Sequence, residues 1–136
     1  MRVETIATGY LLIGDGPLTT AAYMSQSMPI PSGKPEIAAA TAVAGEMLGL
    51  QALFLDAGSG ANQPVPLSSI AAVRSHTQTP LIVGGGLNDA PSIEAAWQAG
   101  ADLVVVGSAI ENRPEDLNWL PNPFAFQSKG ATDSWR

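Results

Sequence analysis

The stretch "FLDAGSGA" at residues 54–61 brings together residue types that could hold a small molecule. An apolar run ends there in a carboxylate, Asp56, and only alanine, glycine and serine follow it as far as residue 61. Small side chains let another group approach the backbone closely, and exposed backbone N–H groups bind anions. The stretch therefore predicts a place where something compact meets the backbone, with a carboxylate at the edge of that opening.

Similar loops follow the other apolar runs of the chain. They read "GDGP" at 14–17, "GGGLNDA" at 84–90 and "GSAI" at 107–110. In a parallel sheet all of them would emerge on one side, where helix N-termini and N–H groups form an anion cradle. Tight turns also favour glycine, so a single loop would carry little weight. The last two loops are more specific, because phosphate sites of (β/α)8 barrels are commonly built from the loops after strands 7 and 8.

Short apolar runs alternate with helical patterns and supply the elements that would position these loops. We predict strands near 5–13, 51–55, 80–84 and 102–106, and helices over 34–49, 66–77 and 90–101. The last three strands are continuous apolar runs, which is typical of parallel strands covered on both faces. The repeated strand–helix order predicts an α/β fold with a curved parallel sheet. The longer first interval would hold a loop and a short helix.

Apolar residues at helical spacing indicate the helices. The first helix carries Ile37, Val43, Met47 and Leu48, and the second carries Leu67, Ile70 and Val73 on one face. Pro35 near the start of the first helix and Gly49 at its end fit the usual helix boundaries.

Composition argues against several kinds of partner. The 136 residues are 46% hydrophobic with a formal net charge of −6, which fits one globular domain with no basic patch for nucleic acid. The chain has no cysteine and one histidine, His76, which we expect to cap a helix end, so a transition-metal site is not predicted. No apolar run approaches the roughly 20 residues of a membrane span. We expect a soluble, cytoplasmic protein that is not membrane-spanning.

Five segments resemble, in order and spacing, the second half of a known enzyme family. They are "ATGYLLIGDGPLTT", "IPSGKPEIAAA", "LFLDAGSGA", "LIVGGGL" and "GADLVVVGSAIE". They are similar to the geranylgeranylglyceryl phosphate synthases, the PcrB-like prenyltransferases. The resemblance implies an α/β fold in the form of a parallel (β/α) half-barrel, strands 5–8 of a TIM (β/α)8 barrel. It implies an enzyme, a phosphoglycerol geranylgeranyltransferase, which joins geranylgeranyl diphosphate to sn-glycerol 1-phosphate in archaeal-type ether lipid biosynthesis.

The resemblance also implies which residues hold the glycerol phosphate. Asp56 would accept the proton of the hydroxyl that is alkylated, and backbone N–H groups would bind the phosphate. The implied substrate-binding set is Phe54, Leu55, Asp56, Ala57, Gly58, Ser59, Gly60, Gly84, Gly85, Gly86, Gly107 and Ser108. Tyr10 is a further candidate that could equally belong to the core. Lys34 begins a helix at the end that disfavours a cation, so a structural or a ligand role is open.

Mg²⁺ is implied as a cofactor, with ligands in the family's first half and none in this chain. Asp15, Asp56, Asp89 and Asp102 are dispersed along the sequence, which predicts no metal cluster among them. Phe54 and Asp56 stand where the family usually has tyrosine and glutamate. The carboxylate is kept, but it is one methylene shorter.

We divide the chain into residues 1–111, the second half of a phosphate-binding barrel, and a divergent tail at 112–136. Trp119, Phe124 and Phe126 of the tail either pack on the body or stay loose. Open sheet edges and an open inner face predict a homo-oligomer or association with a first half. Two other interpretations are open. One is a non-catalytic half-barrel that binds phosphorylated small molecules, and the other is the second half of another phosphate-binding barrel, such as a histidine-biosynthesis isomerase or cyclase.

Overall fold

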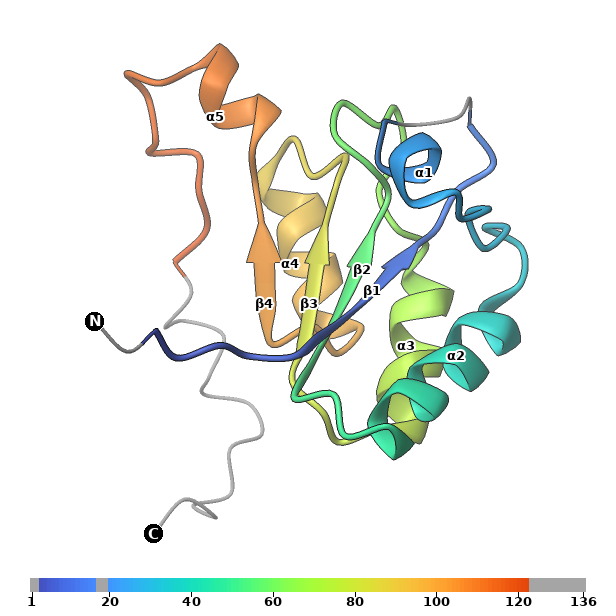
Figure 1. Cartoon of the computed structure of the whole chain (residues 1–136). Helices are drawn as coiled ribbons and strands as arrows, with labels where there is room; N and C mark the ends of the chain where they lie inside the picture. Colours follow the sequence, from blue (N-terminus) through green and yellow to red (C-terminus); the bar gives the residue numbers. More distant parts are fainter. Residues whose placement is uncertain (1–2, 17–19, 123–136) are drawn as a thin grey trace, which may run out of the picture.

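The four predicted strands form one parallel sheet in the computed structural model, which describes residues 3–16 and 20–122 (Figure 1). They lie side by side in sequence order: β1 (Thr8–Leu12), β2 (Ala52–Asp56), β3 (Leu81–Gly84) and β4 (Leu103–Val105). All three pairings are parallel. The predicted strands are confirmed, although β1 begins at Thr8 and not near residue 5.

The predicted helices are confirmed as well. They are α2 (Pro35–Met47), α3 (Leu67–His76) and α4 (Ala90–Gln98), which lie against one face of the sheet (Figure 1). Two short helices, α1 (Thr20–Ser25) and α5 (Ser108–Asn112), lie beyond the carboxyl ends of the strands. α4 begins where the Asp89 carboxylate accepts a hydrogen bond from the Ser92 N–H at 2.8 Å, a regular N-cap.

The core lies between the sheet and these three helices. It contains alternate strand residues and the facing helical residues: Leu11, Leu53, Leu55, Leu81, Val83, Ala38, Ala42, Ile70, Val73, Ile93 and Ala96. Because side chains alternate along a strand, only every second strand residue can reach the helices.

The apolar residues that indicated α2 are not the ones it buries. Ile37, Met47 and Leu48 are 45%, 83% and 82% exposed. The buried face consists of Ala38, Ala39, Ala42 and Gly45. A Cβ at Gly45 would lie 3.1 Å from Leu50 Cδ1, so small residues are what allow α2 to approach the sheet. In α3, Ile70 and Val73 are buried as expected, whereas Leu67 is largely exposed.

The opposite face of the sheet has no helix over it within the described residues. The strand register aligns a row across this face: Tyr10, Phe54, Ile82 and Leu103. Tyr10 and Leu103 are 49% and 58% exposed. The continuous apolar runs predict cover on both faces, whereas the described residues supply helices for one face only.

At the amino ends of the strands, Arg74 of α3 ties together the loops that enter β3 and β4. Its Nε donates to the carbonyl oxygen of Gly100 at 3.1 Å, and its Nη2 donates to that of Thr79 at 2.9 Å. Nη2 also contacts Asp102 Oδ2 at 3.0 Å, and the same oxygen accepts the Leu81 N–H at 2.8 Å. One guanidinium thus satisfies three acceptors around the start of β3.

Glu46 of α2 closes the same end of the sheet from the other side. Its Oε2 accepts hydrogen bonds from the N–H groups of Gln78 and Thr79 and from the Thr79 hydroxyl, the last at 2.7 Å. These bonds hold the pKa of Glu46 below its ordinary value, with the Thr79 hydroxyl as the largest cause.

The described part of the tail packs onto the body. Trp119 and Leu120 contact the core, and the Arg113 guanidinium lies 4.6 Å from the centre of the Trp119 ring. Arg113 also donates to the Asn88 carbonyl oxygen at 2.9 Å. Of the two alternatives, packing holds for Trp119, while Phe124 and Phe126 fall outside the described residues. None of the described helices combines the length and the apolar character needed to cross a membrane.

Candidate functional site

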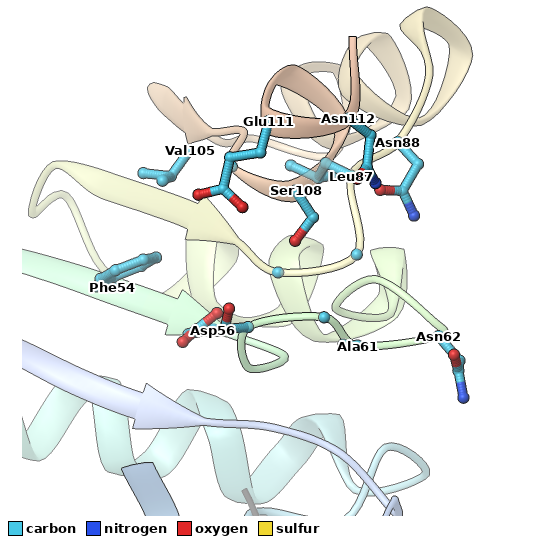
Figure 2. Close-up of a pocket in the computed structure, with 15 residues that line it drawn as sticks. Phe54, Asp56, Ala61, Asn62, Leu87, Asn88, Val105, Ser108, Glu111 and Asn112 are labelled. Atoms are coloured by element: carbon cyan, nitrogen blue, oxygen red, sulfur yellow. The ribbon is translucent and has the colours of Figure 1, made fainter. Parts of the chain in front are cut away.

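The loops after β2, β3 and β4 enclose a cavity of about 510 Å³ at the carboxyl ends of the strands (Figure 2). Asp56 stands at the end of β2 on one side, and Ser108 and Glu111 of α5 lie across from it. We call this the first cavity. This is the edge of the sheet at which the sequence predicts an anion site.

Most of the predicted substrate-binding residues line the first cavity: Phe54, Asp56, Ser59, Gly60, Gly85, Gly86, Gly107 and Ser108. Four predicted residues do not. Leu55 is fully buried in the core, because it alternates with the two cavity residues on either side of it in β2. Gly84 is buried against Phe54, and a Cβ there would lie 2.8 Å from the Phe54 ring.

The other two have their N–H groups engaged within the protein. The Gly58 N–H donates to Asp56 Oδ1 at 2.9 Å, and the Ala57 N–H donates to the Gly84 carbonyl oxygen at 3.0 Å. Ala57 lines a different cavity, described below. These two residues therefore shape the loop without facing the first cavity.

Sequence reasoning missed several residues of the wall: Ala61, Asn62, Leu87, Asn88, Val105, Glu111 and Asn112. Asn62 directly follows the stretch at 54–61, and Asn88 lies inside the predicted loop at 84–90. Extending the first stretch by one residue and including the polar residues of the second loop would have found them. Glu111 and Asn112 are brought to the cavity by α5, a helix that no pattern in the sequence predicts.

Backbone N–H groups around the cavity, among them the predicted phosphate donors of Ser59, Gly60, Gly85, Gly86 and Ser108, have no hydrogen-bond partner among residues 3–16 and 20–122. Free N–H groups on two facing loops can bind an anion. The described cations, Lys34, Arg74 and Arg113, do not line the cavity, so this part of the chain offers an anion only neutral donors.

The cavity positions that hold glycine do so for different reasons. Gly85 has φ +81°, and a Cβ there would lie 2.7 Å from Asp56 Oδ1 and 2.8 Å from the Ala57 nitrogen. Gly86 has φ +70°, and its Cβ would lie 2.8 Å from the Gln63 carbonyl oxygen. The protein itself demands glycine at both positions. Gly107 differs: its φ is −113°, and no atom of the described residues lies within 4 Å of where its Cβ would be. The space beside Gly107 is open to a ligand.

Two donors hold the Asp56 carboxylate. The Tyr10 hydroxyl donates to Oδ2, and the Gly58 N–H donates to Oδ1. The Tyr10 ring meets the Phe54 ring edge-on, with centroids 5.4 Å apart. Burial, and then the bond to Asp56, raise the pKa of Tyr10 well above its ordinary value. Tyr10 is therefore a half-exposed neighbour of Asp56 and not part of the core.

Lys34 and His76 lie apart from the cavities. Lys34 is exposed and lies 3.7 Å from Glu36 in an ion pair. His76 ends α3, and its Nδ1 lies 2.8 Å from the Ala72 carbonyl oxygen, so it caps that helix end as expected. The described residues contain no group of three or more His, Cys, Asp or Glu side chains that could hold a metal ion.

A second cavity, of about 670 Å³, lies on the β1 side of Asp56. Tyr10, Thr20 of α1 and the loop around Asp15 line it. Asp15 orders that loop by accepting the Ser32 N–H at 3.1 and 3.2 Å. Asp56 lines both cavities and so stands at the boundary between them.

The chain is similar to proteins of known family. The sequence model of the PcrB family matches residues 1–119. The chain belongs to the PcrB family. It is 50% identical over 118 residues to the geranylgeranylglyceryl phosphate synthase of Spirosoma linguale, covering 87% of this chain and 47% of that protein. It is 44% identical over 111 residues to that of Pyrococcus furiosus, covering 82% and 43%.

A solved structure of the family carries the same fold. The (S)-3-O-geranylgeranylglyceryl phosphate synthase from Thermoplasma acidophilum, in complex with its substrate sn-glycerol-1-phosphate, is similar with a TM-score of 0.77 and 30% sequence identity. The match covers 87% of this chain and 46% of that chain. This PcrB-family chain thus spans about half the length of the curated relatives it matches.

Proposed function

We propose that the chain supplies the glycerol-phosphate side of a prenyltransferase site. It binds sn-glycerol 1-phosphate in the first cavity, and Asp56 accepts the proton of the attacking hydroxyl. The observation that carries this proposal is the set of free N–H groups on two facing loops, with Asp56 in the same wall. The sn-glycerol-1-phosphate complex of the Thermoplasma acidophilum relative supports it.

In this proposal the phosphate lies between the two loops and beside Gly107. The N–H groups of Ser59, Gly60, Gly85 and Gly86 donate to its oxygens, and the open space at Gly107 admits them. Asp56 and Glu111 are the charged groups of the wall, and both repel an anion. We therefore expect the described part of the chain to bind the phosphate weakly.

The reaction would take place at Asp56, where the two cavities meet. The glycerol hydroxyl oxygen forms a bond to the allylic carbon of geranylgeranyl diphosphate, and the carbon–oxygen bond to the diphosphate breaks. The electron pair of that bond leaves with the diphosphate, and the hydroxyl proton passes to the Asp56 carboxylate. The second cavity would receive the prenyl diphosphate, because it shares Asp56 with the first.

The Mg²⁺ that the resemblance implies does not fit the described residues. No group of three or more possible ligands lies among them, and each Asp56 oxygen already accepts a hydrogen bond. Its ligands would have to come from elsewhere in the active enzyme. No step is assigned to the metal here.

We further propose that the sheet corresponds to strands 5–8 of a (β/α)8 barrel, with residues 112–136 as a separate tail. Helices on one face, the strand order and an apolar second face support the correspondence, since the inner face of a barrel is packed by side chains of the other strands. The open face and edges then favour pairing with a first half or with a second copy. The product would enter archaeal-type ether lipid synthesis in the cytoplasm.

Calorimetry on the full chain tests the binding step. We expect sn-glycerol 1-phosphate to bind more tightly than its mirror image, sn-glycerol 3-phosphate. Asp56→Asn should remove most of that preference while leaving the affinity for inorganic phosphate within about twofold, because the phosphate donors are backbone groups. A folded chain that binds neither glycerol phosphate would contradict the proposal.

Complementation separates the enzyme from the non-catalytic half-barrel. Adding the first half of the Spirosoma linguale relative should give geranylgeranyl transfer that Asp56→Asn abolishes. Phosphate binding that persists while no supplied first half gives transfer would favour the non-catalytic interpretation.

A further inference from the structure

Tyr10 reaches Asp56 from the neighbouring strand, and the proposed function leaves this contact without a role. In the register of the sheet, Tyr10 lies opposite Phe54, and Leu12 lies opposite Asp56. The Tyr10 side chain extends along the sheet toward Asp56, and its hydroxyl donates to Oδ2. A residue of β1 thus donates a hydrogen bond to the carboxylate at the end of β2.

The contact restricts the carboxylate from both sides. Tyr10 occupies one oxygen, and the Gly58 N–H occupies the other at 2.9 Å. A carboxylate has about four acceptor positions, so about two stay available to a substrate. With both oxygens tethered, rotation of the carboxylate would break one of the two bonds.

The phenol is itself held in place. Its ring meets the Phe54 ring edge-on at an interplanar angle of 90°, and Phe54 lines the first cavity. Tyr10 lines the second cavity and not the first. The donor therefore approaches Asp56 from the β1 side and leaves the first cavity clear.

We propose that Tyr10 is a positioning residue, which holds the Asp56 carboxylate in the orientation that receives the glycerol hydroxyls. The proposal rests on the proposed function of Asp56. Orientation matters because a displacement of about 1 Å at a reacting group can cost on the order of a hundredfold in rate. Without the phenol, Asp56 would keep only the bond within its own loop.

Tyr10→Phe tests the proposal, because it keeps the ring against Phe54 and removes only the hydroxyl. We expect the affinity for sn-glycerol 1-phosphate to fall about tenfold and that for inorganic phosphate to stay unchanged. In the Asp56→Asn background the same substitution should cause no further loss. Tyr23→Phe is the matched control, because Tyr23 is 70% exposed and lines neither cavity. Equal losses for both ligands, or no loss for either, would overturn the proposal.

A readout without ligand tests the pair directly. The chain has two tyrosines, so Tyr23→Phe leaves Tyr10 as the single phenol for titration by ultraviolet absorbance. Adding Asp56→Asn should lower the pKa of Tyr10 without restoring its ordinary value, because burial is the larger cause of the shift. If the wild-type chain binds no glycerol phosphate, the proposed function fails, and an unchanged titration would then refute the pair as well.

Discussion

The two ends of the sheet are built in opposite ways. At the amino ends of the strands, the charged side chains of Arg74, Glu46 and Asp102 form hydrogen bonds with backbone groups of the loops. At the carboxyl ends, backbone N–H groups of Ser59 and Gly85 remain without partners within the described residues. The side chains at the amino ends already have partners, whereas the N–H groups at the carboxyl ends are available to a ligand. The amino ends of the strands thus serve stability, whereas the proposed binding site lies at the opposite ends of the same strands.

Substitution of Arg74 should give the largest effect, a loss of stability with no change in ligand affinity. Arg74→Ala removes the donor of the Gly100 and Thr79 carbonyl oxygens and one of the two donors of Asp102 Oδ2, which should lower the free energy of unfolding by about 2–3 kcal/mol. Urea denaturation measures the loss. The sn-glycerol 1-phosphate affinity of the folded protein should not change, and a parallel loss of affinity would show that the two ends of the sheet are not independent.

Lys34→Ala is the control for removing a cation. Its ion pair with Glu36 is exposed at 3.7 Å, so the expected change is below about 0.5 kcal/mol. Similar costs for the two substitutions would mean that charge, and not the bonds made by Arg74, stabilises the chain.

At the other end, Gly107→Ala should reduce affinity and spare stability. Its Cβ meets no protein atom but enters the space proposed for the phosphate, so we expect at least a tenfold loss of sn-glycerol 1-phosphate affinity, or about 1.4 kcal/mol. The loss of stability should stay below about 1 kcal/mol. Calorimetry and thermal unfolding measure the two quantities.

Two other glycines frame this result. Gly33→Ala also adds a Cβ in open space, but Gly33 lines neither cavity, so affinity should not change. Gly85→Ala should lose stability as well as affinity, because its Cβ would collide with Asp56 and the Ala57 backbone. If Gly107→Ala behaves like Gly33→Ala, the phosphate does not lie beside Gly107.

The smallest effect should be a change in how stability depends on pH in acid. The pKa of Glu46 is lowered in the folded chain, so its contribution to stability is present above the unfolded value of about 4.5 and is lost as the pH falls through the folded value. Glu46→Gln should flatten the decline of stability below about pH 4.5. The pKa of Asp89 is lowered too, through Ser92, so part of the decline should remain.

Thermal unfolding between pH 7 and pH 3 checks the acid effect. Glu36→Gln provides the control, because within the described residues the Glu36 side chain forms only the exposed ion pair with Lys34. An acid profile that Glu46→Gln leaves unchanged would show that its three hydrogen bonds contribute nothing to the stability of this end.

The sequence was sufficient for the elements and the edge of the sheet that carries the site, but not for individual wall residues. Continuous apolar runs separate strands from helices well, and small-residue loops mark the carboxyl ends of the strands. The resemblance places Leu55 in the site as part of the segment around Asp56, yet alternation along β2 turns its side chain into the core. Because side chains alternate along a strand, only every second residue of a contiguous strand motif can face the site.

Contacts between distant segments were beyond sequence reasoning. The bond between Tyr10 and Asp56 joins residues 46 positions apart and depends on the register of β1 against β2. The buried face of α2 is made of alanine and glycine, while its large apolar residues are exposed. Hydrophobicity alone favours the large residues, whereas the close approach of the helix to the sheet requires the small ones.

The order of the strands in the sheet also bears on how the chain folds. Partners in β3 and β4 are 21 residues apart (Ile82 and Leu103), whereas those in β1 and β2 are 44 apart (Thr8 and Ala52). Closing a loop twice as long costs about 0.6 kcal/mol more in chain entropy. Pairing of β3 with β4 therefore loses the least chain entropy. β1, which carries Tyr10, would be the last strand to pair.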